Sequence, residues 1–100
     1  MALLSDRSWE EWIAEYEQSH QHPVNRRCHA IGIPLIVSSG LAILPALFLP
    51  HLWWLVGALF GVGWLLQFIG HAFEHKPPEF FKDWRFLCVG VRWWLWKAGF

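Results

Sequence analysis

The feature that most constrains this chain is a long central run without charge, because no Lys, Arg, Asp or Glu occurs between residues 30 and 70. A membrane-crossing helix needs about 20 consecutive apolar residues, so the run is long enough for two such helices. Pro50 and His51 lie near its middle and favour a turn. We therefore expect an antiparallel hairpin of two transmembrane helices, Ala30–Leu49 and Leu52–Gly70.

The composition also indicates a membrane protein. Hydrophobic residues make up 55% of the 100 residues and charged residues 16%. A soluble domain this small has too much surface to bury so many apolar side chains. Nine tryptophans are present, and tryptophan favours the membrane–water interface. The formal net charge is zero, so nothing indicates a nucleic-acid partner. We expect a single domain over residues 1–100.

Proline and glycine residues are predicted to shape the hairpin. Pro34 and Pro45 fall inside the first helix and are expected to kink it. Small residues allow two helix backbones to approach closely. We therefore expect the second helix to pack against the first through Gly57, Gly61 and Gly63.

Basic residues flank the hairpin at one end only. Arg26 and Arg27 precede the first helix, whereas Lys76, Lys82 and Arg85 follow the second, and the turn carries none. Cytoplasmic loops of membrane proteins carry an excess of Lys and Arg. This pattern predicts that both ends of the hairpin lie on the cytoplasmic side.

Two further helices are expected outside the hairpin, which makes the predicted fold an all-α membrane protein. Residues 1–19 are predicted to contain an amphipathic helix, capped by Ser5 or Ser8, that docks on the protein or on the bilayer surface. Its apolar stripe follows i, i+3, i+4, i+7 spacing and comprises Trp9, Trp12, Ile13 and Tyr16. Residues 84–100 carry Arg92 near their middle, where a charge is costly in a bilayer. We expect an interfacial or partly inserted helix there, with a third transmembrane helix as the alternative.

Five of the six histidines lie at the two ends that the hairpin brings to one membrane face. These five are His20, His22, His29, His71 and His75. Neutral imidazoles together with a carboxylate such as Glu74 suit Zn, Fe, Ni or Cu, so the spacing favours a metal site. The alternative is that the histidines only meet solvent and lipid headgroups. His51 lies at the opposite turn and is expected to be an exposed loop residue.

Several polar residues near these histidines are candidates for supporting roles. Asn25, Gln67 or Glu74 could orient ligand imidazoles through hydrogen bonds. Arg26 or Arg85 could neutralise the carboxylate of a substrate.

Two segments resemble the signatures of a known family of small membrane proteins. The first reads HQHPVNRRCHAIGIP over His20–Pro34, and the second reads QFIGHAFEHKPP over Gln67–Pro78. The chain resembles the Mpo-like family over nearly its whole length after the first helix. That family includes the fungal endoplasmic-reticulum 2-hydroxy fatty acid dioxygenase.

The resemblance implies an Fe(II)-dependent dioxygenase that shortens a 2-hydroxy fatty acid by one carbon and releases CO₂. The family's histidines carry over onto His20, His29 and His71, with Asn25 and Glu74 as further motif positions. We therefore take the three histidines and Glu74 as the catalytic group. The expected metal ligands are drawn from all five clustered histidines, and the expected substrate contacts are Asn25, Arg26 and Arg85.

The expected partners are membrane lipid, the 2-hydroxy fatty acid and O₂. A second copy of the chain, in a homo-oligomer, is a further candidate partner. The expected location is the bacterial inner membrane, with the histidine clusters on the cytoplasmic face. Two alternatives come from other functional classes. One is a metal- or haem-binding membrane protein without oxygenase activity, and the other is a structural membrane factor.

Overall fold

The computed structural model describes residues 3–99, and every regular element in this range is helical. In chain order these are α1 (Trp9–Gln18), α2 (Pro23–Phe48), the 3₁₀-helix η1 (Pro50–Leu52), α3 (Trp53–Glu74), the 3₁₀-helix η2 (Glu79–Phe81) and α4 (Phe86–Lys97). The predicted all-α fold is confirmed. The outermost residues of the predicted terminal segments, 1–2 and 100, lie outside the described range.

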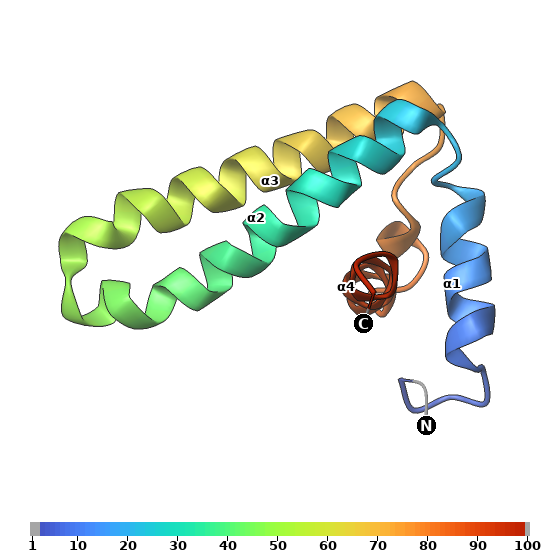
Figure 1. The fold of residues 1–100 in the computed structure, drawn as a ribbon, viewed down its shortest axis with the longest axis horizontal. Coiled ribbons are helices and arrows are strands. Elements are labelled where there is room, and N and C mark those ends of the chain that lie inside the picture. Colours follow the sequence, from blue (N-terminus) through green and yellow to red (C-terminus); the bar gives the residue numbers. More distant parts are fainter. Residues whose placement is uncertain (1–2, 100) are drawn as a thin grey trace.

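Helices α2 and α3 form the antiparallel hairpin, joined by η1 (Figure 1). Both are long and apolar enough to span a membrane. Only 22% of the most apolar stretch of α2 and 11% of that of α3 is buried in the protein. A core helix of a soluble protein would be mostly buried, whereas apolar surface exposed on this scale suits a lipid environment.

The hairpin helices extend beyond the predicted limits at the end opposite η1. Helix α2 begins at Pro23, whose missing N–H is tolerated in a first helical turn, and α3 continues to Glu74. This end of the hairpin, with residues 20–29 and 67–75, is called the foot below. His29 and His71 are therefore held on helices. Helix α2 also continues through Pro34 and Pro45.

The two long helices approach closely near the foot and separate towards the turn (Figure 1). A methyl group added at Gly63 would lie 2.6 Å from Cγ1 of Ile36, and one added at Gly32 would lie 2.9 Å from the Gly63 carbonyl oxygen. The expected role of Gly63 is thus confirmed. The same expectation was wrong for Gly57 and Gly61, because nothing lies within 4 Å of a methyl group at either position. Both are exposed, so they lie on a face of α3 that points away from α2, whereas Gly63 is buried on the facing side.

Helix α1 begins with a reciprocal cap that explains its first residue. The Ser8 hydroxyl accepts a hydrogen bond from the Glu11 N–H at 3.2 Å, and the Glu11 carboxylate accepts one from the Ser8 N–H at 3.3 Å. This capping box satisfies two of the backbone groups left free at a helix start. Of the two candidate caps, Ser8 is therefore the one in use.

Helices α1 and α4 pack together beside the foot, and α4 is seen end-on in Figure 1 where the hairpin lies in the plane. Trp12 meets Phe86 edge-on, with ring centroids 5.2 Å apart. The predicted docking of the α1 stripe on the protein is thus confirmed for Trp12 and Tyr16, both of which are buried. The Trp94 indole N–H donates to the Ala30 carbonyl at 2.9 Å and ties α4 to α2. With 12 residues α4 is about 18 Å long, short of a bilayer core.

Candidate metal centre

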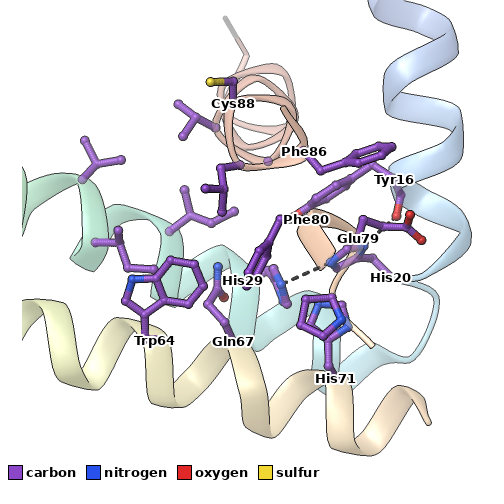
Figure 2. A pocket seen from close by; sticks show the side chains of 17 residues that line it. Tyr16, His20, His29, Trp64, Gln67, His71, Glu79, Phe80, Phe86 and Cys88 are labelled. Atoms are coloured by element: carbon purple, nitrogen blue, oxygen red, sulfur yellow. Dashed lines mark hydrogen bonds between the residues drawn. The ribbon is translucent and has the colours of Figure 1, made fainter. Parts of the chain in front are cut away.

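Three histidines from three separate segments meet at the foot (Figure 2). His20 lies in the link between α1 and α2, His29 lies near the start of α2, and His71 lies near the end of α3. Each offers one ring nitrogen within 4.8 Å of the others. Their exposed fractions are only 3%, 3% and 5%, respectively. Residues some fifty positions apart in sequence are thus brought into one buried cluster.

The backbone of α1 sets the orientation of His20. Its Nδ1 lies 2.6 Å from the Tyr16 carbonyl oxygen, and its ring stacks on that of Tyr16 at 3.9 Å between centroids. Because a carbonyl oxygen can only accept, Nδ1 carries the proton and Nε2 keeps a lone pair. Burial lowers the pKa of His20 to about 4, and the hydrogen bond to Tyr16 opposes this only in part. The ring is therefore neutral at pH 7.

His29 is oriented in the same way by its own helix. Its Nδ1 lies 3.0 Å from the Asn25 carbonyl oxygen, one turn earlier in α2. Its proton is therefore also on Nδ1, and Nε2 keeps a lone pair. The two Nε2 atoms of His20 and His29 lie 3.1 Å apart. With both protons on the far side of the rings, no hydrogen is left to bridge these two nitrogens.

A metal cation between the two lone pairs would resolve this repulsion. Imidazole nitrogen binds such metals at about 2.0–2.1 Å, so two ligands separated by an angle of 90–109° lie about 2.8–3.4 Å apart. The 3.1 Å spacing of the Nε2 atoms falls in this range. His71 adds a third nitrogen donor, and its Nδ1 is buried without a hydrogen-bond partner among the described residues. The three ligand nitrogens lie within 4.8 Å of one another, so the group could hold a metal ion, and three nitrogens alone do not select which one.

Asn25 and Glu74 hold the foot together from outside the cluster. The Glu74 carboxylate accepts hydrogen bonds from the His22 N–H at 2.7 Å and from the Asn25 side-chain amide at 3.2 Å. The Asn25 amide also donates to the Ser19 carbonyl at 2.9 Å. These bonds join α3 to the start of α2 and to the link that carries His20. The two side chains thus connect the segments that carry the clustered histidines, through backbone groups and each other.

The remaining predicted site residues lie away from the three-histidine cluster. His22 caps α2 by accepting from the Val24 N–H at 3.1 Å, and His75 is an exposed residue with left-handed backbone at the end of α3. Arg26 is exposed. Arg85 forms an ion pair with Asp83 at 2.7 Å. The sixth histidine, His51, is exposed in η1 as expected.

A largely apolar cavity of about 310 Å³ adjoins the cluster (Figure 2). The histidines line one end, and Ile36 and Trp64 line the hairpin wall two helical turns further along. Helix α4 and η2 close the other side, with Phe80 and Phe86 among the lining residues. The volume is at the lower end of the range for small-molecule sites.

The cavity contains residues that were not singled out from the sequence. Trp64 precedes His71 by seven residues, and helical periodicity could have placed the two on one face. Glu79 had no such signal, because it lies outside the long helices. Its side chain is buried and pairs with Lys82 at 3.1 Å. Phe80 lies beside it and meets Trp64 edge-on at 5.4 Å between centroids.

The chain matches a known protein family over residues 7–99, nearly its whole length. The family is described as 2-hydroxy-palmitic acid dioxygenase Mpo1-like. The chain belongs to this family. No curated protein and no solved structure matches it. Membership in the Mpo1-like family confirms the resemblance drawn from the two signatures, and the family description agrees with a buried histidine cluster that opens on an apolar cavity.

Proposed function

We propose that this protein is an Fe(II)-dependent dioxygenase of 2-hydroxy fatty acids. One 2-hydroxy acid and one O₂ would give an acid shorter by one carbon, one CO₂ and one water. The observation that carries the proposal is the pair of Nε2 lone pairs of His20 and His29, which face each other at 3.1 Å beside an apolar cavity. The Mpo1-like family supplies the substrate class.

The three clustered histidines would hold the iron through neutral ring nitrogens. Bound iron would supply the activation of O₂ and the oxidation at the hydroxyl-bearing carbon. The chain itself contributes orientation, because the carbonyl groups of Tyr16 and Asn25 keep the Nδ1 protons of His20 and His29 away from the metal. Glu74 fixes the relative position of the segments that carry the ligands. His22 and His75 lie outside this group, so their predicted role as ligands rests on their positions in the sequence alone.

The cavity suits a fatty acyl chain whose polar end lies at the foot. Its apolar walls exclude water from the reacting carbon, and Ile36 and Trp64 would contact the chain beyond the histidines. A substrate dissolved in the bilayer could reach the cavity without crossing bulk water. Asn25, Arg26 and Arg85 stay predicted substrate contacts, with Arg26 or Arg85 opposite the carboxylate. Arg26 is exposed at the foot, where it would attract an anion.

The proposal is tested with protein purified in detergent. Fe(II) is added without oxygen, O₂ is then admitted together with 2-hydroxypalmitic acid, and the products are measured by mass spectrometry. We expect the acid one carbon shorter and CO₂ in equal amounts. Absence of both from a sample with iron bound at one equivalent per chain would count decisively against the proposal. Palmitic acid without the hydroxyl serves as the control and is expected to persist.

A further inference from the structure

Gln67 places an amide in the wall of the cavity beside the histidines. It precedes His71 by four residues on α3, so the two side chains share one helix face. Gln67 is 8% exposed, and its Oε1 atom has no hydrogen-bond partner among the described residues. Figure 2 shows its side chain extending from α3 into the space between Trp64 and the histidines.

The crossing of α2 and α3 holds this amide in place. A methyl group added at Gly32 would lie 2.8 Å from the Gln67 Oε1 atom, so the absence of a side chain at Gly32 makes room for the amide. Burying an amide without a hydrogen-bond partner is unfavourable. Glu79, another buried polar residue of the wall, has Lys82 as an ion-pair partner at 3.1 Å, although its Oε2 atom makes no hydrogen bond among the described residues. Gln67 is thus a buried polar group that is suited to a ligand.

The amide of Gln67 has the right chemistry for a hydroxyl group. An amide offers both a donor NH₂ and an acceptor carbonyl, and a hydroxyl can bond to either. The histidines at the same end of the cavity would leave the acyl chain pointing towards Trp64 and Ile36. In that orientation the second carbon of the acid lies close to the polar end, within the region that Gln67 borders.

We propose that Gln67 is a substrate-binding residue whose amide pairs with the 2-hydroxyl group and so selects 2-hydroxy acids over plain fatty acids. This inference rests on the proposed function, which supplies the substrate class. A fatty acid without the hydroxyl leaves the buried amide unpaired. Sites that are built to bond a hydroxyl discriminate strongly against analogues that lack it.

The test measures binding to metal-free protein in detergent, where iron contributes nothing to the preference. The affinities for 2-hydroxypalmitic acid and palmitic acid are compared by calorimetry in the wild type and in Gln67→Leu. We expect the wild type to bind the hydroxy acid roughly tenfold more tightly, as one additional buried hydrogen bond allows. In Gln67→Leu this ratio should fall to about one, with the affinity for palmitic acid changed less than about twofold.

Controls separate a binding role from a structural one. Gln18→Leu changes an exposed glutamine at the end of α1 and should keep the wild-type ratio. If Gln67→Leu does not fold, Gln67→Met keeps the side-chain length and provides the same comparison. Equal weakening for both acids, or an unchanged ratio, would overturn the inference.

The inference and the proposed function can fail separately. Turnover of 2-hydroxypalmitic acid by the iron-loaded wild type, combined with an unchanged ratio in Gln67→Leu, would overturn the role of Gln67 alone. The opposite result is an affinity ratio near one in metal-free Gln67→Leu together with no turnover by the wild type. It would support the role of Gln67 in binding and overturn the dioxygenase activity.

Discussion

The chemistry of the site depends on where two protons lie. His20 and His29 each donate Nδ1–H to a backbone carbonyl, so both Nε2 lone pairs are committed to the same small space. A backbone carbonyl oxygen can only accept a hydrogen bond, so each Nδ1 atom must keep its proton and each Nε2 atom its lone pair. The two lone pairs repel each other, and a cation bound between the Nε2 atoms of His20 and His29 would remove this repulsion.

Loss of a clustered histidine is expected to abolish metal binding. His29→Ala and His71→Ala should each weaken iron binding by at least about 100-fold, because changes to residues around ligands already cost 10–100-fold. His51→Ala changes an exposed residue at the opposite end of the hairpin and should bind as the wild type does. Elemental analysis after dialysis provides the measurement. The same metal content in all three variants would refute the site, and circular dichroism would confirm that each is folded.

At the scale of the elements, the packing of α2 on α3 decides whether the cluster can form. The contact is made near the foot through Gly32, Gly63 and Gly70, where an added methyl group would meet atoms of the facing helix. Helical periodicity gave no reason to prefer Gly63 over Gly57 or Gly61, since α3 is apolar on every side. The close approach also places Gln67 and His71 of α3 against the start of α2.

Two alanine substitutions in α3 should therefore differ sharply. Gly63→Ala forces a methyl group against Ile36 and the Gly32 backbone, and is expected to destabilise the protein by about 1–3 kcal/mol. Gly61→Ala enters open space and should be neutral or slightly stabilising, because alanine favours helix more than glycine does. Thermal unfolding in detergent measures both. A Gly61→Ala loss as large as that of Gly63→Ala would contradict the observed helix contact.

For the whole molecule, the hairpin, α1 and α4 together place one buried site at one end of two exposed apolar helices. Helix α4 closes the cavity by packing on α1 through Phe86 and Trp93, and it is tied to the hairpin at Ala30. The Trp93 indole donates to Glu17 at 3.3 Å, which adds a polar contact to the same interface. The site therefore requires elements from both ends of the chain.

The orientation of the hairpin in the membrane can be tested by thiol labelling. The basic residues around the foot predict a cytoplasmic foot and an external turn. In a background with Cys28→Ser and Cys88→Ser, His51→Cys should react with an impermeant reagent in intact bacterial cells. Lys76→Cys should react only after the cells are permeabilised. The reverse pattern would place the foot outside.

The residues alone determined the hairpin, because a charge-free run of this length with a proline at its centre can satisfy its backbone in lipid only as helices. They also determined that histidines from both ends would share one face, since an antiparallel pair returns to its starting side. Tertiary structure decided that His20, His29 and His71 meet while His22 and His75 do not, because side-chain direction depends on local backbone hydrogen bonds. Tertiary structure also decided where the cavity lies. The apolar side chains of α4 line it, but their sequence does not show which helix they pack against.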